Sequence, residues 1–347
     1  MRAIPRARAA LGRVRARFAP SGLILLYHRI ADPPSDPFGL SVTPAGFAEH
    51  LEVIRKLARP TSLPDLVRSL GGRRVPRRAV VLTFDDGYAD NLHAARPLLE
   101  RFEIPATVFI ATGYVGGDRE FWWDDLERSL FTPGTSPRIP EVLQGAGGSR
   151  GSDGVGDFGE SDALGHRGFR YADAGSPHPR HSLYREIYPI LQAMPPEARD
   201  RAIGDLRRSA GLADLARADR RPLSGEELAR LAESPLIDLG AHTIDHPLLT
   251  ALPGPGRRLE ILGSKASLEE MIGRRVENFS YPHGGLDAET ARDVAEAGFA
   301  SACTTRVARL SRGEFPMDLP RVVPEGEDGA SFERFLRRWL DVGRGPG

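Results

Sequence analysis

The sequence contains very little cysteine and lysine, and it lacks any long apolar run. Its single cysteine, Cys303, excludes an internal disulfide framework and any zinc cluster built from cysteines. No run of about 18 uncharged apolar residues is present, so we expect no membrane-spanning helix. Lysine occurs only twice among the 47 basic residues, which are balanced by 47 acidic ones. A net charge of zero gives no reason to expect a nucleic-acid partner.

The first 20 residues are rich in arginine and contain no acidic residue. Arginine recurs through the whole segment, whereas a secretory signal would place about 7–15 apolar residues and a small-residue cleavage site after its basic end. We therefore interpret residues 1–20 as a basic tail that could make a weak peripheral contact with an anionic membrane surface. The location expected from this pattern is the cytoplasm or the inner face of the membrane.

Short apolar segments that end in polar residues alternate with segments of helical spacing. We predict buried strands at residues 23–27, 79–84, 106–110, 236–241, 278–281 and 299–304. Helical spacing is found at residues 44–58, 183–215, 224–233, 257–273 and 288–297. Alternating strands and helices with polar residues at the strand ends indicate an α/β fold. It could be a (β/α) barrel or a doubly wound open sheet.

One long segment interrupts this alternation. Residues 133–182 are rich in Gly, Ser, Pro and Arg and show little periodicity, so we predict an inserted flexible loop region there. The rest of residues 21–340 is predicted to form one barrel domain. The histidines of the insert, together with His50 and His93, are expected to be ordinary surface or loop residues; those of the insert are His166, His178 and His181.

Reactive side chains gather where predicted strands end. Asp85 and Asp86 follow one strand, His242 and His246 follow another, and His283 follows a third. Two imidazoles and one carboxylate can hold a divalent metal ion and leave positions open for water and substrate. The second carboxylate would then be free to take a proton from water at the metal. The sequence therefore predicts a metal-dependent hydrolytic site.

Three motifs carry a resemblance to a known family. They are Thr83-Phe84-Asp85-Asp86-Gly87, His242-Thr243-Ile244-Asp245-His246 and Ser280-Tyr281-Pro282-His283-Gly284. They resemble the motifs of the polysaccharide deacetylases, also called the NodB homology domain, over residues 22–130 and 222–324. The resemblance implies a distorted (β/α)7 TIM-like barrel that removes N-acetyl, and sometimes O-acetyl, groups from sugars with the help of a metal ion.

The resemblance also implies roles for individual residues. Asp85 would be the general base, and Asp86, His242 and His246 would be the metal ligands. The backbone N–H of His283 would help to hold the oxyanion. The expected ion is Zn²⁺, with Co²⁺, Fe²⁺ or Ni²⁺ as alternatives.

The sequence departs from the family pattern in two places. The family commonly has an arginine where this chain has Ser280, and we expect Arg321, from a later strand, to replace it beside the base. The late histidine motif that supplies a general acid is missing. His28, in a Tyr-His pair after the first strand, is predicted to take that role, unless it is a core-edge histidine held by a backbone carbonyl.

Three further residues are expected to contact the substrate. Tyr281 and Pro282 belong to the third motif, and Trp123 follows the strand at 106–110. Tryptophan faces stack well on sugar rings, but at least one of the adjacent pair Trp122 and Trp123 is expected to lie in the core.

The function predicted from these motifs is removal of N-acetyl groups from an N-acetylhexosamine-containing glycan or lipid-linked glycan precursor in surface-polysaccharide biosynthesis. Three alternatives remain open at this stage. The same barrel could hydrolyse a non-sugar amide, or it could be an inactive sugar-binding module. A metal-dependent oxygenase is the third, but oxygenases with two histidines and one carboxylate usually have β-rich folds.

Overall fold

The sheet at the centre of the computed structural model has seven strands, all parallel. The structure describes residues 22–70, 76–144, 155, 157–173, 175, 178–310, 313–326 and 328–340. The strands follow the order β1-β5-β6-β7-β8-β9, and β4 also pairs with β5. Their bounds are β1 Gly22–Tyr27, β4 Arg59–Pro60, β5 Ala79–Phe84, β6 Ala106–Ile110, β7 Ile237–Ala241, β8 Asn278–Ser280 and β9 Ser301–Cys303.

The sheet curls into a barrel because the chain after β9 pairs with both β9 and β1. The N–H of Thr304 donates to the Leu319 carbonyl at 2.9 Å, and the N–H of Leu26 donates to the Val322 carbonyl at 2.9 Å. Residues 319–322 thus bridge the two end strands. The barrel expected from the sequence is confirmed. The doubly wound alternative is wrong, because an open sheet would leave its two end strands apart.

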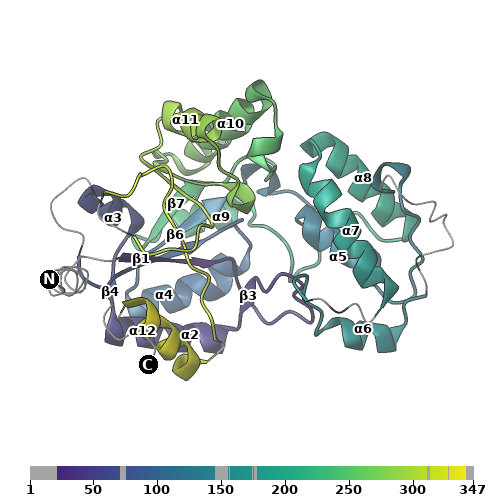
Figure 1. The fold of residues 1–347 in the computed structure, drawn as a ribbon, viewed down its shortest axis with the longest axis horizontal. Helices are drawn as coiled ribbons and strands as arrows, with labels where there is room; N and C mark the ends of the chain where they lie inside the picture. The colour runs from purple at the N-terminus through teal and green to yellow at the C-terminus, as the bar shows by residue number, and fades with distance from the viewer. Residues whose placement is uncertain are drawn as a thin grey trace, which may run out of the picture.

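Helices cover the outside of this barrel (Figure 1). They are α2 Pro44–Leu57, α3 Leu63–Leu70, α4 Arg96–Phe102, α9 Gly225–Ala232, α10 Gly254–Ile272, α11 Ala288–Glu296 and α12 Gly329–Leu340. The helix predicted at residues 44–58 is present as α2. Its N-cap is Thr43, whose hydroxyl accepts a hydrogen bond from the Gly46 N–H at 3.1 Å.

Successive side chains of a strand point to opposite faces of the sheet, so the core of the barrel consists of two clusters, one on each face. Leu23 and Leu25 of β1 join the large cluster beneath the surrounding helices, whereas Ile24 joins a smaller cluster with Val81 and Phe109. Both faces of β1 and β5 are therefore buried, as their continuous apolar runs predict. Cys303 belongs to the smaller cluster, and burial raises the pKa of its thiol to about 12.

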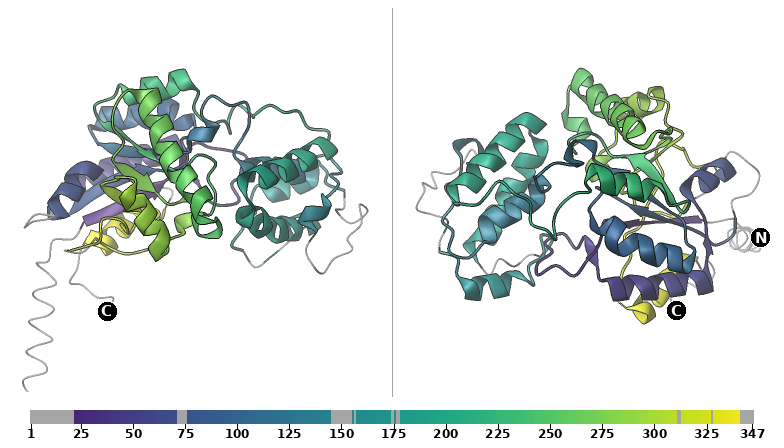
Figure 2. Two further views of the ribbon diagram at one scale, coloured as in Figure 1. Left: turned by 90° about the horizontal axis from the view of Figure 1, so that it is seen from above. Right: turned by 180° about the vertical axis from the view of Figure 1, so that it is seen from behind.

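A helical lobe stands beside the barrel, between β6 and β7 in the chain (Figures 1 and 2). Its helices are α5 Trp122–Phe131, α6 Glu160–His166, α7 Pro179–Ala193 and α8 Pro196–Ser209. The lobe has a hydrophobic cluster of its own, in which Phe131, Phe158 and Phe169 are buried beside residues of α7 and α8.

The lobe corrects the sequence prediction for residues 133–182. We predicted a flexible loop there, but α6 and the first residues of α7 lie in this segment, and Leu143, Val155 and Phe158 are buried. The prediction failed because the apolar residues of the segment are too sparse to show a period. They are buried in one hydrophobic cluster with residues of α5, α7 and α8.

The strap, residues 31–40, crosses from the barrel to the lobe. It connects β2 (Arg29–Ile30) with β3 (Ser41–Val42), which pair with each other outside the main sheet. The Tyr171 N–H of the lobe donates to the carbonyl of Pro37 at 2.7 Å. The strap therefore ties the two parts of the molecule together.

Three histidines that we predicted to lie on the surface are buried. His166 and His181 stack in the core of the lobe with ring centroids 5.3 Å apart. His50 is buried between the barrel and α12, where its ring stacks on Phe332 at 4.0 Å. The sequence does not predict that these histidines are buried, because nothing in the neighbouring residues identifies the side chains that pack against them.

No helix in the described part of the chain is both long enough and apolar enough to cross a membrane. The basic tail predicted at residues 1–20 lies outside the described residues.

His50 provides a pH test of the packing between α2 and α12. Its Nδ1 lies 3.2 Å from the Tyr27 hydroxyl and its Nε2 lies 3.0 Å from the Gly326 carbonyl, an arrangement that suits one neutral tautomer. Burial lowers the pKa of His50 from its usual 6.5 to about 4. Between these two values the unfolded chain binds a proton that the folded chain does not, so stability falls as the pH falls.

We therefore expect the protein to lose about 1–2 kcal/mol more of its unfolding free energy than a His50→Gln variant when the pH falls from 7.5 to 5. Urea unfolding of both proteins at the two pH values measures this difference. Equal losses would mean that folded His50 takes up a proton as easily as the unfolded chain does.

Candidate metal and hydrolytic site

Four strands bring the candidate residues to one rim of the barrel. His28 follows β1, Asp85 and Asp86 follow β5, His242 follows β7, and His283 comes three residues after β8. In a parallel barrel these carboxyl ends all open on the same face. The strand order therefore brings these residues to one rim of the barrel, as the sequence predicts.

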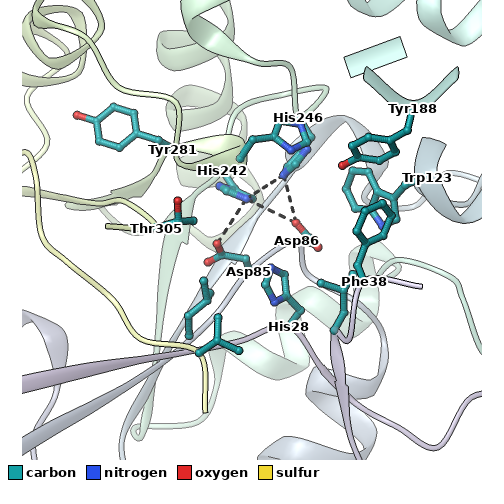
Figure 3. Close-up of a pocket in the computed structure, with 14 residues that line it drawn as sticks. His28, Phe38, Asp85, Asp86, Trp123, Tyr188, His242, His246, Tyr281 and Thr305 are labelled. Carbon is teal, nitrogen blue, oxygen red and sulfur yellow. Dashed lines mark hydrogen bonds and ion pairs between the residues drawn. The ribbon is translucent and has the colours of Figure 1, made fainter. Parts of the chain in front are cut away.

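Asp86, His242 and His246 converge on one point. The Nε2 atoms of the two histidines are 3.1 Å apart, and Asp86 Oδ1 lies 3.5 Å from the first and 3.4 Å from the second (Figure 3). All three residues are buried, and their ligand atoms lie within 4.8 Å of one another. Asp86 Oδ1 has no hydrogen-bond donor among the described residues. Two imidazole nitrogens and a carboxylate oxygen without a hydrogen-bond donor, crowded around one point, are an arrangement that suits a divalent cation.

The tautomer of His242 also suits a metal ligand. Its Nδ1 lies 2.7 Å from the carbonyl oxygen of Ser280, which can only accept, so Nδ1 carries the proton. Nε2 is then left with its lone pair directed toward Asp86 and His246. A backbone carbonyl that fixes the orientation of a ligating histidine is a common feature of metal sites.

The backbone at this site is held in an uncommon conformation. Asp86, Thr243, His246 and His283 all have positive φ, between 54° and 77°. Such residues persist only where the surroundings fix them, and they gather at functional sites.

Residues from two other helices hold the loop between the two ligating histidines. Glu260 of α10 accepts hydrogen bonds from the N–H groups of Ile244 and Asp245 at 2.8 and 3.0 Å. Arg199 of the lobe helix α8 donates to the carbonyls of Asp245 and His246 at 2.6 and 3.4 Å. The lobe thus helps to position a candidate metal ligand.

Asp85 is paired with Arg321. The guanidinium makes two parallel bonds of 2.7 Å to the two carboxylate oxygens, and both side chains are buried. Burial alone would raise the pKa of Asp85, but Arg321 and His242 beside it hold that pKa well below its usual range. The predicted contact between this aspartate and an arginine from a later segment is present.

Ser280 joins this pair. Its hydroxyl accepts from Arg321 at 2.8 Å and donates to Asp85 Oδ2 at 3.1 Å. Arg321 also donates to the Thr83 hydroxyl and to the Thr304 carbonyl, so each of its five N–H groups has an acceptor. The serine that departs from the family pattern therefore makes room for the arginine and bonds to it.

A pocket of about 260 Å³ opens above these residues. His28 lines it and is half-buried, as are Phe38 of the strap and Tyr188 of α7. Figure 3 shows Phe38, Trp123 and Tyr188 on one side of the pocket and Thr305 and Tyr281 on the other. The complete lining is Leu26, His28, Phe38, Leu40, Asp85, Asp86, Trp123, Tyr188, His242, His246, Tyr281, His283, Thr305 and Val323.

The sequence prediction missed Phe38 and Tyr188. Neither belongs to a motif, and they are 150 positions apart in the chain. Only the contact between the strap and α7, whose Phe38 and Tyr188 ring centroids are 4.7 Å apart, reveals them.

The three residues predicted to contact substrate differ in position. Trp123 lines the pocket with its ring centroid 4.7 Å from that of His246, and its Nε1 donates to the Tyr88 hydroxyl. The Tyr281 hydroxyl points away from the site and donates to the Met317 carbonyl at 3.0 Å. Pro282 is buried and is not part of the lining. Trp122 is buried as well, in agreement with the expectation that at least one tryptophan lies in the core.

His283 lines the pocket beside the metal ligands. Its ring centroid lies 4.6 Å from that of His246, and burial lowers its pKa to about 3. Its Nε2 is buried and has no hydrogen-bond partner in the described part of the chain.

Comparison with known proteins identifies one family. A sequence model of the family described as polysaccharide deacetylase matches residues 72–131 and 173–302, more than half of the chain. An 82-residue stretch, 23% of this chain, is 33% identical to the poly-β-1,6-N-acetyl-D-glucosamine N-deacetylase of Escherichia coli K12. That stretch spans 12% of the E. coli protein, so the likeness concerns a small part of it.

Solved structures share the fold. IcaB from Ammonifex degensii superimposes with a TM-score of 0.57 at 16% identity, over 92% of this chain and 97% of that one. The deacetylase PplD of Streptococcus pyogenes gives a TM-score of 0.55 at 16% identity, over 92% of this chain and 99% of that one. At this level of identity the likeness concerns the fold.

The convergence of three ligand atoms predicts binding of one divalent ion. We expect the purified protein to bind about one Zn²⁺ per chain, and Asp86→Asn, His242→Ala and His246→Ala to weaken that binding by about 10- to 100-fold or more. Titration with Zn²⁺ after chelation measures it. His93→Ala is the matched control, because the His93 side chain is 49% exposed, contacts Glu227 and does not belong to the group of three ligand residues. Equal affinity in all four variants would contradict the site.

Proposed function

The chain belongs to the polysaccharide deacetylase family, and on that premise we propose that it hydrolyses the acetamide of an N-acetylhexosamine unit in a glycan. The observation that carries this proposal is the arrangement of two carboxylates. Asp86 faces two histidines as a ligand, while Asp85 beside it is paired with Arg321. In this proposal Asp86 binds the metal ion, and Asp85 accepts a proton.

A divalent ion at Asp86, His242 and His246 would polarise the acetyl carbonyl and lower the pKa of a water molecule toward about 7. Zn²⁺ is the ion we propose, with Co²⁺, Fe²⁺ or Ni²⁺ as alternatives, because imidazole and carboxylate suit all of them.

Asp85 acts as the general base in this proposal. Its low pKa keeps the carboxylate ionised at neutral pH, so that it can accept the proton that the attacking water loses. Arg321 and Ser280 act through Asp85: they orient its two oxygens and are positioning residues. Both side chains of the pair are buried, and the bidentate contact fixes the direction of both carboxylate oxygens.

His28 and His283 complete the proposed machinery. His28 lines the pocket from the first strand and would give a proton to the leaving amine of the sugar. The backbone N–H of His283 would donate a hydrogen bond to the carbonyl oxygen as negative charge develops on it. The positive φ of His283 supports this role, because a fixed backbone conformation fixes the direction of its N–H.

The proposed substrate class follows from the family and from the E. coli relative, whose name specifies a β-1,6-linked N-acetylglucosamine polymer. We propose a polymer or lipid-linked glycan that contains N-acetylhexosamine, as in surface-polysaccharide biosynthesis. A non-sugar amide is the second candidate. An inactive sugar-binding module is less well supported, because both aspartates and both ligating histidines are kept and converge.

Acetate release tests the proposal directly. The zinc-loaded protein should release acetate from β-1,6- or β-1,4-linked N-acetylglucosamine oligosaccharides, and Asp85→Asn should lower that rate by about 10²-fold or more while zinc stays bound. Asp205→Asn, on the exposed face of α8, is the matched control. If Asp85→Asn lost zinc and Asp86→Asn kept it, the roles assigned to the two aspartates would be exchanged. If no acetylated sugar but a small amide were hydrolysed, the second candidate would replace the first.

Moving the arginine tests its positioning role. Arg321→Ser should lower kcat by about 10²-fold with little change in KM, because Asp85 loses its bidentate partner. Adding Ser280→Arg to that variant puts a guanidinium back beside Asp85 from the position that the family commonly uses. We expect the double variant to regain about tenfold or more of the lost kcat. A purely structural arginine would show no such recovery of kcat once both variants were shown to be folded and zinc-loaded.

A further inference from the structure

An aromatic wall on the lobe side of the pocket is left without a role by the proposed reaction. It consists of Phe38 from the strap and Tyr188 from α7, with Trp123 next to them (Figure 3). The ring centroids of Phe38 and Tyr188 are 4.7 Å apart, and Tyr188 also lies 4.9 Å from Trp122. Two parts of the chain that are far apart in sequence thus present aromatic surface to one pocket.

The strap is fixed to the lobe by the residues just before Phe38. Arg220 donates to the carbonyl of Ser35, and the Ser35 hydroxyl bonds to Glu127 of α5. Asp36 accepts from the N–H groups of Leu40 and Ser41 at 2.9 and 2.8 Å, which closes the strap behind Phe38. Phe38 is therefore held in place before any ligand arrives, which reduces the entropy lost on binding.

Phe38 and Tyr188 differ from the aromatic residues that only stabilise the lobe. Tyr184, one turn before Tyr188, is fully buried, and so is Phe121. Phe38 and Tyr188 are half-buried, and their open surface faces the pocket. The Tyr188 hydroxyl makes no hydrogen bond with any described residue, so it is free for a ligand. Apolar surface next to a free hydroxyl suits a ligand that has both C–H and O–H groups on one face.

We propose that Phe38 and Tyr188 form a subsite for a pyranose ring of the substrate. One face of a hexopyranose presents C–H groups that pack on an aromatic ring, while its edge presents hydroxyls that can bond to Tyr188. This inference rests on the proposed function and adds to it: the strap and the lobe, rather than the barrel motifs, select the sugar. The wall is linked to the ligand cluster through the two tryptophans, since Tyr188 packs on Trp122, and Trp122 packs on Trp123. Trp123 in turn packs on His246. A ring on the wall would therefore be close to the acetamide that reacts.

Steady-state kinetics and calorimetry test the subsite. With N-acetylglucosamine oligosaccharides of both linkages, Phe38→Leu and Tyr188→Leu should each raise KM by roughly tenfold and leave kcat within about threefold. Tyr188→Phe keeps the ring and loses the hydroxyl, so its KM should rise by only about two- to threefold. Phe315→Leu is the matched control, because Phe315 is exposed and is not part of the lining. Zinc content should be the same in all four variants.

Calorimetric titration of the zinc-loaded Asp85→Asn protein separates binding from turnover. Roughly tenfold weaker binding of the same oligosaccharides after adding Tyr188→Leu would support the subsite even if the wild-type protein released no acetate. In that case the proposed reaction would fail and the subsite would stand. Wild-type turnover with KM unchanged in Phe38→Leu and Tyr188→Leu would overturn the subsite and leave the reaction intact. A fall in kcat alone would also overturn it, because that result would assign the wall to positioning of the catalytic groups.

Discussion

The buried pair of Asp85 and Arg321 is the interaction on which the rest of the site depends. Arg321 belongs to the segment that closes the barrel, and its five N–H groups bond to residues in or just after three strands, β5, β8 and β9. A buried ion pair that loses one partner typically costs about 3–5 kcal/mol, because the other charge is left unpaired. The segment that completes the barrel therefore also supplies the positive charge that is paired with Asp85.

The barrel and the place of the motif residues at its strand ends could be predicted from the sequence because their signals are local. The strands at 79–84 and 106–110 have the bounds expected from their apolar runs, and the motif residues follow each strand end. The lobe could not be predicted in the same way. Phe158 and His166 are buried in the lobe. They stand as isolated apolar or aromatic residues in a segment rich in Gly, Ser and Pro, so no periodic pattern in the sequence indicates that they are buried.

Arginine composition explains a second gap in the sequence prediction. Because arginine is so frequent in the chain, the sequence does not show which arginines are buried. Arg321 is identified only because Ser280 stands where the family commonly has an arginine. The structure separates them by burial: Arg29, Arg180, Arg199 and Arg321 are among the largest fully buried side chains. Guanidinium groups are suited to such positions because five donors in a plane can satisfy several carbonyls and carboxylates at once, which the three donors of a lysine cannot match.

Buried arginines also connect the lobe to the rest of the molecule, and these contacts determine whether the lobe can move as a lid. Arg199 reaches from α8 to the carbonyls that flank a metal ligand, and Arg220 joins Asp124 of the lobe to the strap. Asp124 in turn accepts from Tyr88, which holds the indole of Trp123. Opening the lobe would break these buried charged contacts together and release both His246 and Trp123. These contacts therefore favour a fixed cleft, in which the aromatic wall and the candidate metal ligands keep one relative geometry.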